Sequence, residues 1–386
     1  MSQDETRAQV EEAAEPQPAA EEAKRTVLIT GFPGFLAKRL LRRLGKEQPE
    51  NRYVLLVEGR FQEKAEQELR QLAAAVPALE GRWEVFAGDI TDPQLGLSYG
   101  DYWDLASRVN RVWHFAAIYD LAVRAEVARA VNVDGTRHVL DFCAACTDFR
   151  CLYYVSTCYV SGDRTGVIKE DELVKGQAFK NHYESTKYAA EVEVQQRRDK
   201  VPSVVFRPAI VVGDSRTGET DKYDGPYYMI RLLMRMPRWL PMVAIGRGKS
   251  VINLVPVDFV VNAMAAISGQ EGAIGKTFQL ADPAPLPTVE GLDLILKSLG
   301  RGKTFGRVPA GLMDWLMGIR FVRRLLQMPR ETVVYMNHDT RYDTTNTQRA
   351  LEGTGVRCPR LPDYIANLTD YVYQHPEKTF LVRHEL

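Results

Sequence analysis

Short hydrophobic segments alternate with amphipathic stretches along the first half of the chain. Runs of apolar, β-branched and aromatic residues predict buried strands, at 26–30, 53–57, 83–87, 109–116 and 151–156. Apolar residues at helical spacing predict helices, at 35–44, 62–75 and 127–145. Because parallel strands are joined by crossover helices, this order is typical of an α/β domain whose parallel sheet is covered on both faces.

The pattern changes after Pro208. Prolines and glycines become frequent as far as about Pro287, and the alternation is lost. A chain of 386 residues is long enough for a large domain with a smaller lobe. We therefore expect a doubly wound parallel sheet over 25–215, to which 251–282 returns, and a C-terminal substrate-binding lobe over most of 216–386.

Composition narrows the class of protein. The 50 basic and 50 acidic residues give a net charge of zero, which does not favour a nucleic-acid partner. Five cysteines do not form a disulfide framework in a chain of this length and suit a reducing cytoplasm. Residues 1–24 resemble a disordered acidic tail rather than a secretory signal, and no run reaches about 18 apolar residues. We expect a cytoplasmic protein, with peripheral membrane contact as an open alternative.

A glycine-rich loop follows the first predicted strand and opens the first predicted helix. Gly31 can form the tight turn, Gly34 lets the backbone approach a pyrophosphate, and Ala37 permits close helix–sheet packing. The N–H groups at the start of the helix then point at the phosphates. This context predicts a Rossmann-like dinucleotide site. Its candidate ligands in the loop are Gly31, Phe32, Pro33, Gly34, Phe35 and Leu36.

The choice between NAD(H) and NADP(H) stays open. Glu58 ends the second strand, where a carboxylate can bind the ribose hydroxyls and repel a 2′-phosphate, which favours NAD(H). Arg60, Lys38 and Arg39 are close enough in sequence for any of them to neutralise a phosphate, which favours NADP(H). A Gly-Asp turn after the third strand adds two candidates beside the adenine, Asp89 and Ile90.

Tyr183 and Lys187 are one helical turn apart and lie on one helix face. The pKa of a free phenol is about 10, and a neighbouring ammonium lowers it, so the pair is expected to pass a proton near pH 7. Upstream, Thr157 follows Ser156 at the end of the fifth strand, which is the order a carbonyl reductase requires. Ser185 and Thr186, between the pair, are expected to pack or cap.

Several short segments together identify a family. The chain resembles the extended short-chain dehydrogenase/reductases, with a male-sterility-type NAD-binding domain. Within them it is most similar to the fatty acyl-CoA reductases and the thioester reductase domains of peptide and polyketide synthases. The segments are TGFPGFLA (30–37), GDITDPQLGLS (88–98), HFAA (114–117), NVDGT (132–136), VSTCYVSG (155–162), YESTK (183–187), RPAIVVGDSRTG (207–218) and DGPYY (224–228).

The resemblance implies roles for individual residues. Thr157 orients the substrate carbonyl, Tyr183 is the general acid or base, and Lys187 tunes Tyr183 and binds the nicotinamide ribose. Asn132 supports the lysine through a proton-relay water. Three further residues would line the cofactor groove or pass the nicotinamide carboxamide: Ala116, Ala117 and Pro208. The acyl-reductase branch usually carries Arg where Glu58 stands, so the resemblance favours NADP(H) while this residue favours NAD(H).

The function expected is reduction of a carbonyl or thioester on a lipophilic, fatty-acyl or polyketide-like substrate by an NAD(P)-dependent oxidoreductase. The substrate could be a CoA or carrier-protein thioester. Because no synthetase modules flank the domain in this sequence, we expect it to meet its substrate as a free enzyme, alone or as a homodimer. Two alternatives stay open. One is a hydroxyl dehydrogenase or epimerase for a sterol-like or sugar-nucleotide substrate, and the other is a non-catalytic dinucleotide sensor.

Other patterns carry less weight. Cys143 and Cys146 have zinc-like spacing, but no histidine cluster or second close pair completes four ligands, so no metal is expected. His114 is expected to make a structural hydrogen bond rather than act as a base. The stretches 230–243 and 312–328 mix apolar residues with arginines. They could lie on a membrane surface, cover an acyl chain, or pack as ordinary helices of the lobe.

Overall fold

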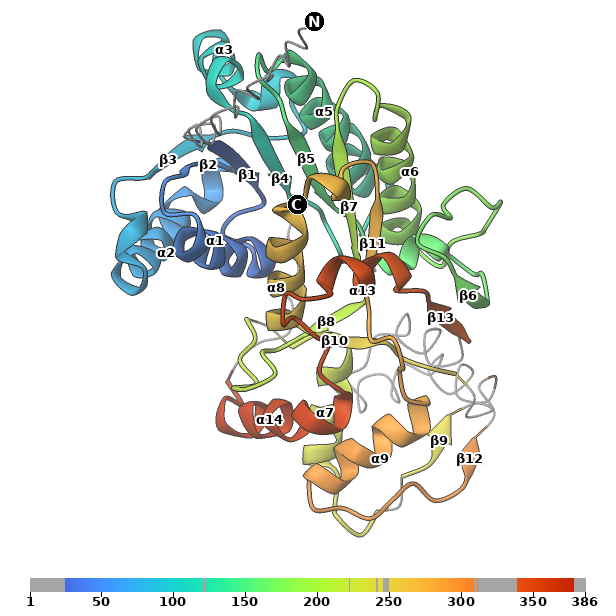
Figure 1. Ribbon diagram of the computed structural model, residues 1–386. Helices are drawn as coiled ribbons and strands as arrows, with labels where there is room; N and C mark the ends of the chain where they lie inside the picture. Colours follow the sequence, from blue (N-terminus) through green and yellow to red (C-terminus); the bar gives the residue numbers. More distant parts are fainter. Residues whose placement is uncertain are drawn as a thin grey trace, which may run out of the picture.

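A seven-stranded parallel sheet forms the centre of the molecule (Figure 1). The computed structural model describes residues 25–120, 123–221, 223–240, 242–245, 250–308, 311 and 339–377. The strand order is β11-β7-β5-β4-β1-β2-β3. The strands are β1 (Thr26–Thr30), β2 (Arg52–Val57), β3 (Trp83–Ala87), β4 (Arg111–His114), β5 (Cys151–Val155), β7 (Ser203–Pro208) and β11 (Thr277–Leu280). The predicted α/β class with a doubly wound, Rossmann-like sheet is confirmed.

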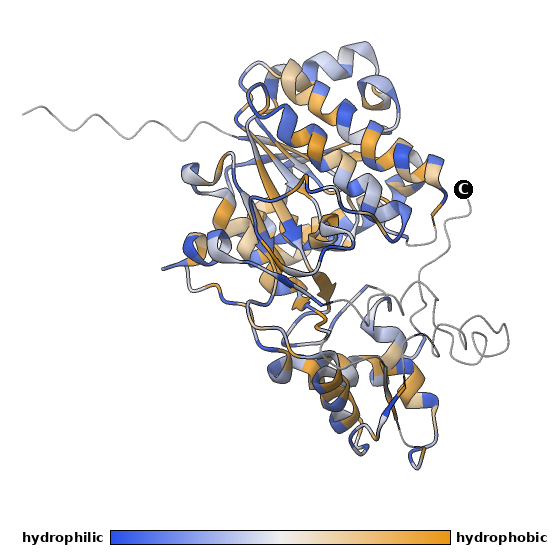
Figure 2. Cartoon of the chain, turned by 90° about the vertical axis from the view of Figure 1, so that its right-hand side faces the viewer, coloured by the Kyte–Doolittle hydropathy of each residue, from blue (hydrophilic) through white to orange (hydrophobic). Residues whose placement is uncertain are grey.

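Helices cover both faces of this sheet. Val27 and Ile29 pack with one group of helices, whereas Leu28 between them packs with the other, because successive strand residues point to opposite faces. Figure 2 shows the strands as mainly hydrophobic and the helices as hydrophobic on one side. The first group is α1 (Phe35–Glu47), α2 (Gln62–Ala75) and α8 (Val257–Ser268). The second is α3 (Tyr99–Arg108), α5 (Gly135–Ala145) and α6 (His182–Gln196).

Two predicted elements differ from the structure. The strand predicted over 109–116 is only β4, because residues beyond His114 leave the sheet beside the glycine loop. The helix predicted over 127–145 is three pieces: α4 (Ala125–Arg129), a π-helical turn η4 (Ala130–Asp134), and α5. Hydrophobic spacing does not reveal a π turn, since the inserted residue changes the helix locally.

The segment 251–282 contributes to both parts of the molecule. Its β10 (Leu254–Pro256) pairs with β8 (Ile210–Val212), outside the main sheet. Its α8 packs on α1, and β11 then joins the main sheet beside β7. The chain therefore crosses between the sheet and the lobe more than once.

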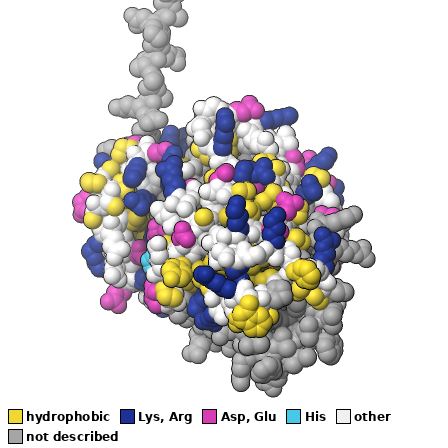
Figure 3. All heavy atoms as spheres, turned by 90° about the horizontal axis from the view of Figure 1, so that it is seen from below, with side chains coloured by type: hydrophobic (Ala, Val, Ile, Leu, Met, Phe, Trp, Pro, Cys, Tyr) yellow, Lys and Arg dark blue, Asp and Glu magenta, His cyan; other side chains and the backbone are white. Residues whose placement is uncertain are grey.

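The lobe has its own apolar cluster. It is formed mainly by α7 (Pro226–Arg235), α9 (Thr288–Ser298) and α14 (Leu361–Gln374), below the main sheet in Figure 1. A short pair of strands, β9 (Ala244–Ile245) and β12 (Arg307–Val308), lies at its far end. Within 230–243, Ile230 and Leu233 are buried in the cluster, so α7 packs as an ordinary lobe helix. Seen from below, Lys and Arg side chains are spread among small groups of hydrophobic side chains (Figure 3).

The segment 339–351 returns to the main sheet before α14 joins the lobe. β13 (Thr340–Tyr342) pairs with β6 (Gly166–Ile168), and α13 (Thr345–Leu351) packs against β11 and α8. The expected tail 1–24 and the stretch 312–328 lie outside the described residues. Within the part that is described, no helix has both the length and the apolar character needed to cross a membrane.

Candidate active site

The glycine loop connects β1 to α1 at the carboxyl edge of the sheet. Gly31 has φ +79°, and Gly34 N–H donates to the Gly31 carbonyl at 2.8 Å. A Cβ on Gly31 would lie 2.6 Å from Ala116 N, and one on Gly34 would lie 2.6 Å from Gly31 O. The first turn of α1 has no side-chain cap and no acidic residue. Its N–H groups and the bare loop backbone fit a dinucleotide pyrophosphate.

The side chains of the loop divide between core and surface. Phe32 and Ala37 are buried in the sheet core, which sets the close approach of α1 to the sheet. Pro33, Phe35 and Leu36 are half-buried and Gly34 is exposed. The loop thus presents mainly backbone at its exposed corner, which is the part a phosphate would contact.

The acidic and basic candidates for the adenosine ribose are paired with each other. Arg60 Nε lies 2.7 Å from Glu58 Oε1, and both side chains are 41% exposed. Glu58 directly follows β2, at the same sheet edge as the glycine loop. The pair presents one carboxylate and one guanidinium together, so the geometry favours neither dinucleotide.

Lys38 and Arg39 also have acidic partners. Lys38 Nζ lies 3.2 Å from Glu68 and 3.4 Å from Asp221, and Arg39 Nη1 lies 3.5 Å from Asp214. Two of these acids come from the segment that follows β8 toward the lobe. A 2′-phosphate would therefore have to compete with carboxylates for either cation.

The remaining cofactor candidates follow β3, β4 and β7. Asp89 Oδ1 accepts hydrogen bonds from the N–H and hydroxyl of Thr91, each at 2.8 Å. The Ile90 carbonyl accepts from His138 Nδ1 at 2.8 Å, and the Ile90 side chain is buried. Three further candidates are a half-buried pair, Ala116 and Ala117, and the buried Pro208 that ends β7. All of them lie at the carboxyl edge of the sheet, where open α/β sheets bind ligands.

Thr157, Tyr183 and Lys187 meet where β5 ends against α6. Thr157 is 4% exposed, and its side chain lies beside that of the half-buried Tyr183, whose pKa it lowers. Lys187 Nζ donates to the Val155 carbonyl at 2.8 Å and lies 4.4 Å from the ring centre of Tyr154. The three residues singled out from the sequence are thus brought together, with the tyrosine hydroxyl beside the threonine.

The pKa values correct one expectation. Burial raises the pKa of Tyr183 to about 12, and the Thr157 side chain offsets only part of that effect. Burial lowers the pKa of Lys187 to about 7, against the opposing charge of Glu191. The expectation that the pKa of Tyr183 is lowered is therefore wrong for this structure, because burial is the largest effect on the phenol.

Asn132 lies in the π-helical turn η4 and is 1% exposed. Its Oδ1 accepts from Ile118 N–H at 2.8 Å, and its Nδ2 donates to the Ile118 carbonyl and to Thr186 Oγ1, each at 3.0 Å. Thr186 in turn donates to the His182 carbonyl at 2.6 Å. Asn132 therefore contacts the helix one residue before Lys187. Sequence spacing could not predict the contact between Thr186 and Asn132, because the two residues are 54 positions apart.

His114 makes the expected structural hydrogen bonds. The Thr136 hydroxyl donates to the Asn132 carbonyl at 2.7 Å, so it accepts from His114 Nε2 at 3.1 Å. Nδ1 is then the acceptor for Thr30 Oγ1 at 2.7 Å. Burial, followed by the charge of Lys187, lowers the pKa of His114 to about 3. The imidazole is neutral at physiological pH and joins β1 and β4 to the start of α5.

Sequence reasoning missed two buried charges behind the candidate catalytic residues, Glu191 and Arg207. The Arg207 Nη2 atom lies 2.6 Å from Glu191 Oε1, and the side chains are 1% and 0% exposed. Glu191 stands four positions after Lys187 on the same helix face, a spacing that could have identified it. Among the described residues, no three His, Cys, Asp or Glu side chains are placed to hold a metal ion.

Comparison with known proteins shows which family the chain belongs to. The family profile described as Male sterility protein matches residues 29–264. The chain belongs to this family. Its Male sterility domain is an NAD(P)-binding reductase domain of the extended short-chain dehydrogenase/reductase type, similar to fatty acyl-CoA reductases and thioester reductase domains. The specific dinucleotide is a separate question.

Several relatives of this Male sterility domain are named as reductases. The chain is 28% identical over 65% of its length to the L-2-aminoadipate reductase large subunit of Penicillium chrysogenum, and spans 19% of that protein. It is 25% identical over 62% of its length to fatty acyl-CoA reductase wat of Drosophila melanogaster, and spans 53% of it. The crystal structure of the terminal R domain of the myxalamid PKS-NRPS pathway has a TM-score of 0.77 and 26% identity, with 94% of each chain covered.

Proposed function

We propose that this chain reduces the thioester carbonyl of a lipophilic acyl substrate with NAD(P)H, and that Tyr183 is the general acid. The observation that carries the proposal is that the Thr157 and Tyr183 side chains lie side by side where β5 ends against α6, with the Lys187 ammonium one helical turn away. Two hydroxyls held together at the carboxyl edge of the sheet form a ready site for one carbonyl oxygen.

The cofactor would be held by the residues that fit it. The glycine loop from Gly31 to Leu36 would bind the pyrophosphate, Glu58 or Arg60 would meet the adenosine ribose, and Lys187 would meet the nicotinamide ribose. When bound, the nicotinamide supplies hydride to the carbonyl carbon. The chain's own residues bind, orient and handle the proton.

The proton comes from the Tyr183 hydroxyl. Thr157 and Tyr183 donate hydrogen bonds to the carbonyl oxygen and stabilise the negative charge that develops on it. A Tyr183 pKa of about 12 leaves the phenol protonated until that charge appears. An alkoxide is a stronger base than a phenolate, so the proton moves downhill to the substrate. The Lys187 ammonium then stabilises the phenolate that remains.

A thioester substrate follows from the relatives rather than from the geometry. Hydride addition to a thioester gives a hemithioacetal, which releases the thiol and leaves an aldehyde; a second hydride would give an alcohol. The names of the relatives include an acyl-CoA reductase and a reductase domain of a PKS-NRPS pathway. We infer a CoA or carrier-protein thioester, with the apolar lobe receiving the acyl chain.

The test is NAD(P)H oxidation, followed by absorbance, with acyl-CoAs of increasing length and the matching aldehydes. Tyr183→Phe should lower kcat by about 10²- to 10⁴-fold while binding of NAD(P)H is retained. Tyr188→Phe is the matched control, since it removes a hydroxyl from the same helix where the ring packs on Phe179. Full activity in Tyr183→Phe would refute the general-acid role, and no oxidation with any acyl thioester would refute the substrate class.

A further inference from the structure

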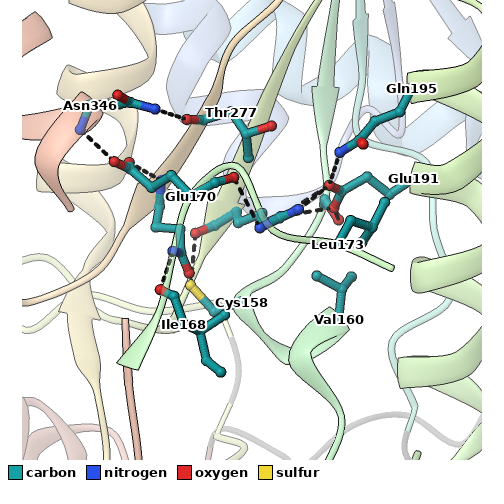
Figure 4. Close-up of polar contacts among 12 residues, drawn as sticks. Cys158, Val160, Ile168, Glu170, Leu173, Glu191, Gln195, Thr277 and Asn346 are labelled. Atoms are coloured by element: carbon teal, nitrogen blue, oxygen red, sulfur yellow. Dashed lines mark hydrogen bonds and ion pairs between the residues drawn. The ribbon is translucent and has the colours of Figure 1, made fainter. Parts of the chain in front are cut away.

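A buried carboxylate lies one helical turn beyond Lys187. Glu191 has no exposed surface. Arg207 Nε donates to Oε1 at 3.0 Å and Oε2 at 3.1 Å, and Nη2 donates to Oε1 at 2.6 Å. The Ser156 hydroxyl at 2.6 Å and Gln195 Nε2 at 3.0 Å complete the donors. Figure 4 shows Glu191 and Gln195 reaching this contact from α6. A buried ion pair adds little net stability over apolar packing, so stability is a weak reason for it.

The end of β5 meets α6 at three successive residues. The Val155 carbonyl accepts from Lys187, and the Ser156 hydroxyl donates to Glu191. The next residue is the catalytic threonine, whose side chain lies beside that of the catalytic tyrosine. Because the three partners on α6 are spaced by four residues, they lie on one helix face. The hydrogen bond from Ser156 to Glu191 holds the residue before the threonine against α6. It therefore sets where the threonine hydroxyl lies relative to the tyrosine.

The same carboxylate is close to the charge of Lys187. Lys187 is 3% exposed, and the groups around it are the catalytic tyrosine of its own helix, Tyr154 in β5 and the neutral His114 in β4. Burial lowers the pKa of Lys187, and the Glu191 charge acts in the opposite direction. Arg207 in β7 reduces that opposing effect because it is paired with the carboxylate. Among the charged groups, Glu191 is the one that opposes the effect of burial and favours the ammonium.

We propose that Glu191 is a positioning residue of the reduction: it anchors Ser156, and with it the adjoining catalytic threonine, and it supplies the negative charge that balances the buried Lys187 ammonium. The inference rests on the proposed function, because it concerns the same tyrosine, threonine and lysine. Glu191 acts only through these residues, since its carboxylate is enclosed by Arg207, Ser156 and Gln195.

The network extends from Arg207 to a second buried carboxylate, which supplies a control. Arg207 Nη1 donates to the Glu170 main-chain carbonyl at 3.3 Å. The Glu170 carboxylate accepts from Gln279 N–H at 2.8 Å, from the Thr347 hydroxyl at 2.7 Å, and from Asn346 N–H in the first turn of α13 (Figure 4). Glu170 therefore belongs to the same network, but its carboxylate is bonded to β11 and α13 rather than to the residues around Lys187.

The decisive comparison is Glu191→Gln against Glu170→Gln. The protonation midpoint of Lys187 is read by NMR of the ¹³C-lysine-labelled, nucleotide-free protein, with the signal assigned by its loss in Lys187→Met. Glu191→Gln should lower this midpoint by about 1 pH unit and move the alkaline limb of the kcat/KM profile by the same amount. Glu170→Gln should lower the unfolding temperature and leave midpoint and limb in place. The charge role would be overturned if the Lys187 midpoint and the alkaline limb stay in place in Glu191→Gln. It would also be overturned if both move equally in the two variants.

A second variant tests the anchoring role and does not depend on Glu191→Gln folding. Ser156→Ala keeps every charge and removes one hydrogen bond to Glu191. It should lower kcat about tenfold through a less well-placed threonine, with KM and the alkaline limb unchanged. An unchanged kcat would overturn the anchoring role. The NMR midpoint needs no turnover, so an inactive wild-type protein would refute the proposed function while the charge role of Glu191 is still tested.

Discussion

The Lys187 ammonium donates a hydrogen bond to the main-chain carbonyl of Val155, at 2.8 Å, where β5 ends against α6. The contact ties α6, which carries Tyr183 and Lys187, to the end of β5, two residues before Thr157. It also keeps the ammonium away from water, and this burial lowers the pKa of Lys187 to about 7. The charge proposed to stabilise the Tyr183 phenolate is therefore sensitive to pH in the neutral range.

We predict that kcat/KM falls as the pH rises above about 7, because Lys187 is an ammonium below its pKa and a neutral amine above it. The profile of kcat/KM reports the free enzyme, which is the state described here. The residual activity of Lys187→Met should lack this alkaline limb. A wild-type profile that is level to pH 9 would show that no lysine of lowered pKa takes part.

Gly31→Ala should abolish nucleotide binding and destabilise the fold. The φ of +79° disfavours any side chain, and a Cβ would meet the backbone of Phe115 and Ala116 at 2.8 and 2.6 Å. Gly275→Ala is the matched control, because Gly275 has φ +81° and nothing within 4 Å of its Cβ position. We expect a loss of about 1–2 kcal/mol for Gly275→Ala and a larger loss for Gly31→Ala, measured by urea unfolding. Equal losses would contradict the close approach.

Glu58→Arg should raise the preference for NADPH over NADH. The change removes the carboxylate that would repel a 2′-phosphate and adds a cation beside Arg60. The ratio of the two kcat/KM values is the measurement, with an expected change of at least about tenfold, which corresponds to about 1.4 kcal/mol. Glu80→Arg makes the same charge change in the exposed connection before β3, at the opposite edge of the sheet. If Glu80→Arg alters the ratio as much, Glu58 is not at the ribose.

His114 should make the fold less stable in mild acid. Burial holds the folded-state pKa near 3, whereas an unfolded histidine titrates near 6.5. As the pH falls below 6.5, the unfolded state therefore binds more protons than the folded state, and stability decreases. The loss between pH 7 and pH 5 should be about 2 kcal/mol, measured by urea unfolding at each pH. His114→Gln should lack this part of the pH dependence, and an identical slope in both proteins would contradict it.

Local sequence patterns predicted much of the site because those parts of it are formed by residues close together in the chain. A strand, a Gly31 turn and a helix must follow one another within a few residues to cradle a phosphate, and Tyr183 and Lys187 need only one helical turn. The predicted strands were confirmed, with the fourth shorter than expected. The π turn at Asn132 was not predicted, since it depends on contacts with Ile118 and Thr186.

The sequence by itself determined the alternating α/β architecture, the glycine loop and the order of Thr157, Tyr183 and Lys187 along the chain. Only the tertiary structure decided their electrostatics. The pKa of Tyr183 is raised rather than lowered because several elements exclude water from it. Glu191 and Arg207 become partners because β7 is placed beside β5 in the sheet and faces α6. Burial and long-range pairing depend on segments far apart in sequence, and local spacing does not encode them.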